Sequence, residues 1–234
     1  MGKRKAGILK KIIVLVMILA LPGFLYYLLT VKGKNRYKPL PFYGSKQVAK
    51  TGHKFHGKFI ADTIYHKLED FKLTDQNGKQ VSFKNFDKKI FVAAFFYTRC
   101  PDVCTKVNSF MDSLDVNYRK NAMVQLVSIT VDPEHDTPLV LKQYAAKYKP
   151  SNKWLFLTGD TTTIYNLAHN GLLLNAAKVG EGNFVLDDKM VLIDAEKRIR
   201  GYYSGSTRAD VMRLNDEIKV LVSEELRKVD KALY

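Results

Sequence analysis

The stretch KIFVAAFFYTRCPDVCTKVNSFM, residues 89–111, decides the fold. Residues 90–97 form an unbroken apolar run of strand length, rich in aromatic and β-branched side chains, which is typical of a strand buried on both faces of a sheet. A two-residue turn then leads to the segment CPDVC, residues 100–104. Apolar residues recur downstream at helical spacing, and Pro101 suits the first turn of a helix, where its missing N–H costs nothing. The sequence therefore predicts a cysteine pair where a buried strand leads into an amphipathic helix.

Cys100 and Cys104 are the only cysteines of the chain. Four residues apart on a helix, they share one face, so their sulfurs can meet or share a ligand. The unpaired N–H groups of a helix N-terminus favour a thiolate, and we expect Cys100 to react in that form. Such a pair can form a disulfide, accept one from a partner, or hold a soft Cu(I) ion. A static structural disulfide is the alternative, but a bridge across so short a segment adds little stability.

The net charge of +15 is concentrated at the N-terminus. Residues 1–61 hold 13 Lys and Arg and no acidic residue, because the first acid is Asp62. The remaining 173 residues hold 25 Lys and Arg against 23 Asp and Glu, a net charge of only +2. A nucleic-acid-binding domain carries its positive charge on the fold itself. We therefore expect no nucleic-acid partner.

An uncharged segment follows the basic residues 1–11. Residues 12–31 are twenty residues without a charge, and at about 1.5 Å per residue a helix of this length spans the hydrocarbon core of about 30 Å. A cleaved signal peptide would have a shorter apolar region and a small-residue cleavage site. We predict a single-pass anchor in the inner membrane, with residues 1–11 in the cytoplasm and the domain in the periplasm. Five basic residues before the span and four after it barely distinguish the two orientations.

The rest of the chain divides into a basic tether, residues 32–61, with little regular structure, and a folded domain, residues 62–234. Strands are predicted at residues 71–73, 81–83, 90–97, 123–131, 154–157, 183–193 and 199–203. Helices are predicted after the cysteines and near residues 138–148, 160–170 and 207–222. Strands that alternate with helices indicate an α/β sheet, and the order predicts a thioredoxin-like fold. Asp132 and Asp136, in the loop after the second buried strand, are interpreted mainly as capping and turn residues.

Three segments together resemble the SCO/SenC family: FFYTRCPDVC, SITVDPEHDTP and LVLKQYAAKY. The resemblance runs from about residue 70 to residue 222. It implies a thioredoxin-like domain with C-x-x-x-C in place of C-x-x-C. It also implies a role in the assembly of cytochrome c oxidase, either by delivering copper to the binuclear copper centre or by keeping its cysteines reduced. In the family, the two cysteines, here Cys100 and Cys104, bind copper with a histidine just before a strand of the C-terminal hairpin.

This chain departs from the family at that histidine. The family's histidine position falls at or near Leu186, and no histidine occurs after His169. Asp187 and Asp188 are hard carboxylates and poor ligands for Cu(I). Two thiolates could still hold Cu(I), whereas Cu(II) requires nitrogen donors. Thiol–disulfide exchange needs only the cysteines.

Three functional hypotheses follow from these residues. The first is a membrane-anchored SCO/SenC-like protein that supports assembly of the oxidase copper centre through Cys100 and Cys104, by thiol–disulfide exchange and Cu(I) transfer, with the copper-centre subunit as its partner. The second is an enzyme, a general periplasmic thiol–disulfide oxidoreductase acting on other thiol proteins. It lacks the proline that thioredoxin-type enzymes place opposite their cysteines, because no proline follows Pro150. The third is a non-catalytic scaffold.

Overall fold

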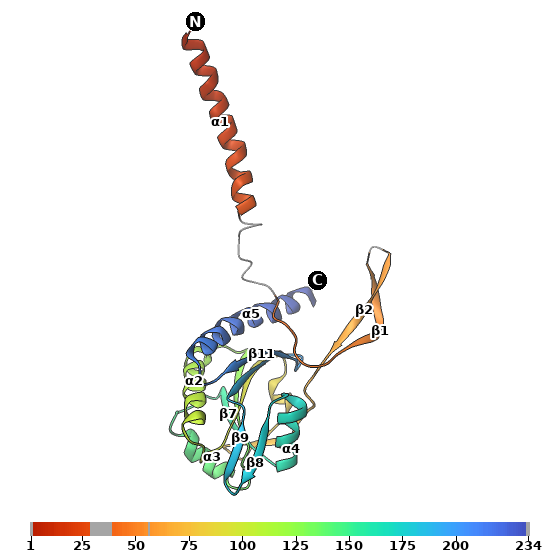
Figure 1. The fold of residues 1–234 in the computed structure, drawn as a ribbon, viewed down its shortest axis with the longest axis vertical. Coiled ribbons are helices and arrows are strands. Elements are labelled where there is room, and N and C mark those ends of the chain that lie inside the picture. The colour runs from red at the N-terminus through yellow and green to blue at the C-terminus, as the bar shows by residue number, and fades with distance from the viewer. Residues whose placement is uncertain (1, 29–38, 56, 233–234) are drawn as a thin grey trace. The chain divides into compact units, whose positions relative to one another are not determined.

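The computed structural model describes residues 2–28, 39–55 and 57–232 (Figure 1). The chain separates into two compact units, residues 1–38 and 39–234. The first contains helix α1 (Gly2–Tyr27). Within the described residues, no helix combines the length and the apolar character needed to cross a membrane. The structure thus does not confirm the predicted anchor at residues 12–31, the last three of which lie outside the described residues.

A seven-stranded mixed sheet forms the centre of the second unit. Its strands, in order across the sheet, are β11 (Ile199–Ser204), β10 (Lys189–Ile193), β5 (Ile90–Phe96), β6 (Val124–Thr130), β7 (Trp154–Thr158), β3 (Leu73–Asp75) and β4 (Gln80–Val81). β5, β6 and β7 are parallel, and the other pairs are antiparallel. Every residue of β5 and β6 is buried, as their continuous apolar runs predicted. The α/β prediction is confirmed.

Helices follow the three parallel strands and the antiparallel strand β11. They are α2 (Asp102–Tyr118), α3 (Pro138–Ala145), α4 (Thr161–Asn166), its π-helical continuation η3 (Leu167–Gly171) and α5 (Arg208–Ala232), with a 3₁₀ turn η2 (Phe83–Phe86). α2 lies against β5 and β6, α3 against β7, and α5 against β11. Thr137 caps α3 through the backbone N–H of Val140, as its position before Pro138 predicted. Pro101 is the N-cap of α2, one position earlier than expected.

The strand predicted at residues 183–193 is divided in two. β9 (Asn183–Leu186) pairs with β8 (Ala176–Gly180), a strand that was not predicted, in a separate two-stranded sheet. β10 alone joins the main sheet. The break falls at Asp187 and Asp188, whose side chains bind neighbouring loops instead of continuing the strand. The predicted long strand is therefore wrong.

The prediction of little regular structure in the tether is also wrong for its second half. β1 (Lys46–Phe55) and β2 (Lys58–Tyr65) form an antiparallel hairpin, with Gly57 at a φ of +78° in the turn. The lysines and glycines of this stretch, which are depleted in strands, masked the β-branched and aromatic residues between them. Residues 32–38 of the predicted tether lie outside the described residues.

Arg200 attaches the start of the second unit to the sheet. Its guanidinium is 1% exposed and forms ion pairs with Asp194 and Glu224. It also donates to the backbone carbonyls of Leu40, at 2.7 Å, and Pro41, at 3.1 Å. The buried apolar side chains of the described residues all lie in this unit. Residues 39–234 thus contain a complete core and are expected to fold without residues 1–38.

Replacing Arg200 should destabilise the domain strongly. Arg200→Leu leaves two carboxylates and two carbonyl oxygens without their shared donor, and we expect the free energy of unfolding of residues 39–234 to fall by about 3–5 kcal/mol. Urea denaturation followed by circular dichroism measures this change. The control is Lys219→Met, which removes an exposed ion pair with Asp216 and should change the free energy by less than about 1 kcal/mol. Equal effects of both variants would contradict this role of Arg200.

Candidate redox and metal site

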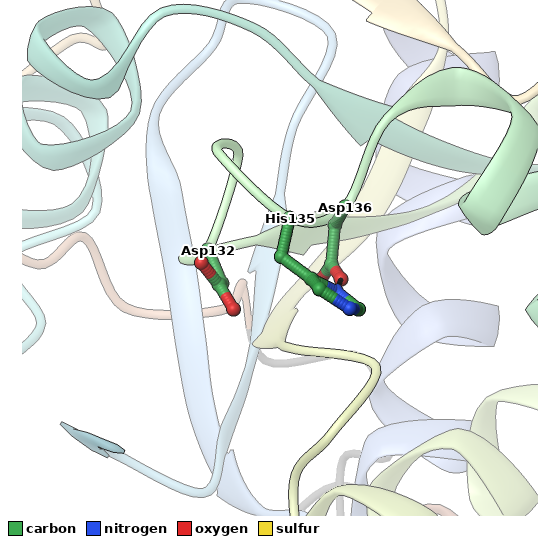
Figure 2. A group of neighbouring side chains, drawn as sticks. All are labelled: Asp132, His135 and Asp136. Carbon is green, nitrogen blue, oxygen red and sulfur yellow. Dashed lines mark hydrogen bonds and ion pairs between the residues drawn. The ribbon is translucent and has the colours of Figure 1, made fainter. Parts of the chain in front are cut away.

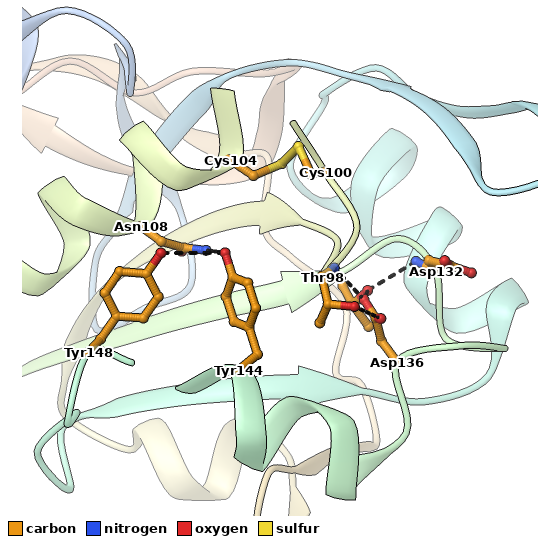
Figure 3. The surroundings of a disulfide bond; sticks show 9 residues. Thr98, Cys100, Cys104, Asn108, Asp132, Asp136, Tyr144 and Tyr148 are labelled. Atoms are coloured by element: carbon orange, nitrogen blue, oxygen red, sulfur yellow. Dashed lines mark hydrogen bonds between the residues drawn. A yellow bond between two sulfur atoms is a disulfide. The ribbon is translucent and has the colours of Figure 1, made fainter. Parts of the chain in front are cut away.

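Cys100 and Cys104 form a disulfide at the carboxyl end of β5 (Figure 3). Their Cα atoms are 5.8 Å apart. Cys104 lies in the first turn of α2 and is 1% exposed, whereas Cys100 precedes the helix and is half-buried. The two sulfurs meet, as their spacing allowed, but only one of the two cysteines is helical. Cys100 is therefore the sulfur that a partner can reach.

A buried carboxylate fixes the turn that carries Cys100. Asp136, on the loop after β6, is fully buried and accepts a hydrogen bond from the backbone N–H of Thr98 at 3.0 Å. It also accepts hydrogen bonds from the hydroxyl of Thr98 (Figure 3) and from the hydroxyl of Thr130. The Thr98 backbone, two residues before Cys100, is thus tied to the neighbouring strand. Asp136 acts across loops, beyond the local turn role predicted for it.

The same loop also binds the residue next to Cys100. The Arg99 guanidinium lies 2.6 Å from the nearly buried carboxylate of Asp132, and this hydrogen bond raises the pKa of Arg99 above its ordinary value. Gly182, in the turn between β8 and β9, also lies close to the guanidinium, since a Cβ there would be 3.2 Å from Arg99 Nη1. The β8–β9 hairpin and the loop after β6 therefore meet at Arg99.

Asp132, His135 and Asp136 bring their side chains close together (Figure 2). One ligand atom from each lies within 4.8 Å of the others, a spacing that could hold a metal ion. Each residue, however, already has a protein partner: Asp132 binds Arg99, Asp136 binds Thr98, and His135 Nδ1 lies 2.9 Å from Asp136 Oδ1. The cluster is explained as a hydrogen-bond network that supports the cysteine turn.

Leu186 occupies the position predicted for the family's histidine. It ends β9 on the same partly buried face as Phe184, whereas Val185 between them is exposed. The Phe184 ring lies 5.0 Å from the ring of Tyr97, which follows β5 three residues before Cys100. The inward face of β9 is thus directed towards the strand end that carries the cysteines, but Leu186 supplies no metal ligand there.

The carboxylates beside Leu186 are engaged elsewhere. Asp187 accepts a hydrogen bond from the backbone N–H of Asn175 at 2.9 Å. Asp188 accepts from the hydroxyls of Ser204, at 2.7 Å, and Ser206, at 2.6 Å. Burial opposes the charge of Asp188, but these hydrogen bonds outweigh it and hold its pKa below the ordinary value. Both carboxylates therefore serve loop structure, and neither replaces the imidazole.

Sequence reasoning located both sulfurs but missed the groups that hold them in place. Threonine is a residue type that is common at protein surfaces, and nothing in the local sequence marks Thr98 and Thr130 as partners of Asp136. The usable signal was their position, because each lies at or just beyond the end of one of two buried strands. Parallel neighbouring strands end at the same edge of a sheet, so polar residues at both ends meet there.

Comparison with known proteins gives one consistent result. The SCO1/SenC family model matches residues 62–222. The chain is 35% identical to a SCO1 protein homologue of Bacillus subtilis over 105 residues, 44% of this chain and 54% of that protein. It is 28% identical to a SCO2-like protein of Rickettsia felis over 217 residues, 90% of this chain and 97% of that protein.

Two solved structures are similar over most of the second unit. BsSco, described as a member of the Sco family of cytochrome c oxidase assembly proteins with a disulfide switch, matches with a TM-score of 0.59 and 27% identity, covering 67% of this chain and 93% of that one. ScoI of Bradyrhizobium japonicum, solved with copper bound, matches with a TM-score of 0.53 and 30% identity, covering 63% and 99%. With the mixed sheet, these structures confirm the predicted thioredoxin-like fold.

Removing the charge of Asp136 should loosen the cysteine turn. In Asp136→Asn, one acceptor oxygen is replaced by an NH₂ group that faces donors, and we expect a loss of about 1–3 kcal/mol in the free energy of unfolding. We also expect the Cys100–Cys104 disulfide to be reduced at several-fold lower dithiothreitol, because the sulfurs are no longer held together. Titration in a dithiothreitol redox buffer measures this. Asp216→Asn, at an exposed carboxylate, is the control, and identical midpoints would refute the positioning role.

Proposed function

The chain belongs to the SCO1/SenC family, and we propose that it supports assembly of the copper centre of cytochrome c oxidase through Cys100 and Cys104. The observation that carries the proposal is the disulfide between these two residues at the end of β5, with one sulfur accessible and one buried. The description of BsSco as belonging to a family of oxidase assembly proteins supports the oxidase as partner. The copper-bound ScoI structure supports copper as the metal concerned.

The proposed chemistry is thiol–disulfide exchange with the oxidase subunit. In the reduced protein, the Cys100 thiolate attacks a disulfide of the partner and forms a mixed disulfide, and one partner sulfur leaves as a thiolate. Cys104 then attacks the Cys100 sulfur, which releases the second partner thiolate. Two electrons pass to the partner, and the chain ends in the disulfide form described here. A dithiol reductant returns it to the starting state.

The difference in exposure assigns the two roles. Cys100 is half-buried and lies outside the helix, so an incoming disulfide can reach its sulfur. Cys104 is 1% exposed, and its position in the first turn of α2 directs it at Cys100 and keeps it from solvent. The attacking sulfur is therefore Cys100, and the resolving sulfur is Cys104.

Copper can be cargo only for the reduced form, because disulfide sulfurs offer no thiolate. The two thiolates suit Cu(I) in two-coordinate geometry, since this soft ion prefers sulfur. The position of Leu186 offers no imidazole, and Asp187 and Asp188 are hydrogen-bonded elsewhere. A Cu(II) site is therefore disfavoured, and thiol exchange is the main activity that we propose.

We further propose that residues 12–31 anchor the chain in the inner membrane, with residues 1–11 in the cytoplasm and the domain in the periplasm. The support is the run of twenty uncharged residues after a basic N-terminus. An oxidising compartment is also where a stable disulfide is expected.

A second function is favoured by the missing histidine. An exchange site without a metal ligand suits a general thiol–disulfide oxidoreductase whose partners are not copper proteins. The two functions share the cysteine chemistry and differ in whether copper binds and in which protein is reduced.

Copper binding separates these two functions. We expect reduced residues 39–234 to bind one Cu(I) in an anaerobic competition titration, and Cys100→Ala to abolish this binding. Leu186→His should strengthen Cu(I) binding at least about ten-fold, because it restores an imidazole on the inward face of β9. Val185→His, on the outward face of the same strand, is the matched control. No binding of Cu(I) by the unmodified domain would leave only thiol exchange.

Loss of either sulfur should impair oxidase assembly in the cell. In strains that carry Cys100→Ser or Cys104→Ser, we expect a several-fold decrease in assembled cytochrome c oxidase, measured by its haem spectrum and activity in membranes. Ser109→Ala, at an exposed position of α2, controls for expression and folding. Normal oxidase in both cysteine variants would overturn the assembly role.

A further inference from the structure

The β1–β2 hairpin is separate from the core of the domain. It forms its own two-stranded sheet and extends away from the seven-stranded sheet (Figure 1). Most of it, residues 46–61, also precedes the stretch that the family model matches. The proposed thiol exchange and copper transfer take place at the cysteines, which lie at the carboxyl end of β5. These reactions do not involve the hairpin.

The hairpin exposes large apolar side chains. Val48 is 80% exposed, Phe59 61%, Ile64 54% and Ile60 43%. The register places them on both faces, since Val48 is opposite Thr63 while Ile64 is opposite Gln47. A two-stranded hairpin without a covered face is only marginally stable in water. Burial of its apolar side chains in an apolar medium that contacts both faces would therefore stabilise the hairpin.

The same strands carry a regular series of positive charges. Lys46, Lys50, Lys54 and Lys58 are all exposed, and Asp62 is the one acidic residue between positions 46 and 65. The hairpin thus has a net charge of +3, half of the +6 that residues 39–234 carry (29 Lys and Arg, 23 Asp and Glu). A surface that alternates lysine with large apolar residues is suited to a membrane interface, where anionic headgroups lie beside acyl chains.

We propose that the β1–β2 hairpin binds the surface of an anionic lipid bilayer. The lysines contact the headgroups, and the side chains of Val48, Phe59, Ile60 and Ile64 enter the boundary with the acyl chains. This inference rests on the membrane anchoring in the proposed function. It adds a second, peripheral contact made by the folded domain itself.

Chain length supports a lipid partner over a soluble acidic protein. If residues 12–31 span the membrane, eight peptide units connect residue 31 to Pro39, and a chain of this length extends at most about 29 Å. Pro41 is held on the domain by Arg200, and the hairpin begins at Lys46. The tether therefore limits how far the hairpin can move from the bilayer surface, which raises its effective concentration there.

The test uses residues 39–234, which lack the anchor and contain the complete core. Co-sedimentation with phosphatidylcholine vesicles containing 30% phosphatidylglycerol is compared with pure phosphatidylcholine vesicles. We expect binding to the anionic vesicles, little binding to the neutral ones, and a loss of binding at 0.5 M NaCl. Equal binding to both, or binding to neither, would overturn the proposal, as would binding that salt does not change.

Two hairpin variants and one control assign the binding surface. Lys46→Glu, Lys50→Glu and Lys58→Glu together should weaken binding about a hundred-fold, and Phe59→Gln with Ile64→Gln should weaken it about ten-fold. The control reverses three exposed lysines elsewhere, Lys84, Lys106 and Lys120, and gives the same net charge as the first variant. If it weakens binding equally, the hairpin is not the binding surface.

Circular dichroism and the reduction midpoint of the Cys100–Cys104 disulfide test whether each variant is folded. Vesicle binding without the anchor is independent of thiol exchange and of oxidase assembly. A failure of this inference is therefore distinguishable from a failure of the proposed function.

Discussion

The geometry of the disulfide depends on one buried carboxylate, that of Asp136. β5 and β6 are parallel, with Phe96 opposite Thr130, so the loops that leave them begin side by side. Without Asp136, the backbone N–H of Thr98 would lose its partner at this edge of the sheet, and a buried donor without a partner is costly. Asp136 satisfies the Thr98 N–H and two hydroxyls at once. The position of the cysteine turn follows from this one group and from the parallel pairing of two strands.

The remaining contacts of the site build on that arrangement. Arg99 is fixed by Asp132 of the same loop, and it in turn contacts the β8–β9 hairpin at Gly182. Phe184 of this hairpin contacts Tyr97 at the end of β5. The cysteine turn is thus enclosed by two loops of distant sequence, while Cys100 keeps partial exposure. The geometry pairs the two sulfurs, and Leu186, on the partly buried face of β9, supplies no imidazole beside them.

The sequence predicted those parts of the fold that depend on local patterns. The apolar runs of β5 and β6 require burial on both faces, and Thr137 before Pro138 is a local capping signal, so both were found. The tether and the β8–β9 hairpin were misjudged because their strands are mostly exposed and carry no alternating apolar pattern. In the site, the cysteines were evident, but the roles of Asp136 and Arg99 depend on contacts across more than thirty residues. Such contacts leave no trace in local spacing.

The position of Arg200 has a mechanical consequence. Register pairs Ile193 of β10 with both Phe91 of β5 and Ile199 of β11, so Arg200 lies near the end of the sheet where β5 begins, while the disulfide lies where β5 ends. The incoming chain is therefore attached near the end of the sheet where β5 begins. Along β5, this end lies about 17 Å, or five strand residues, from the end that leads to the disulfide. A pull on the N-terminal segment is borne by buried ion pairs at one end of the domain. Such a pull acts on the end of the sheet opposite the cysteine turn.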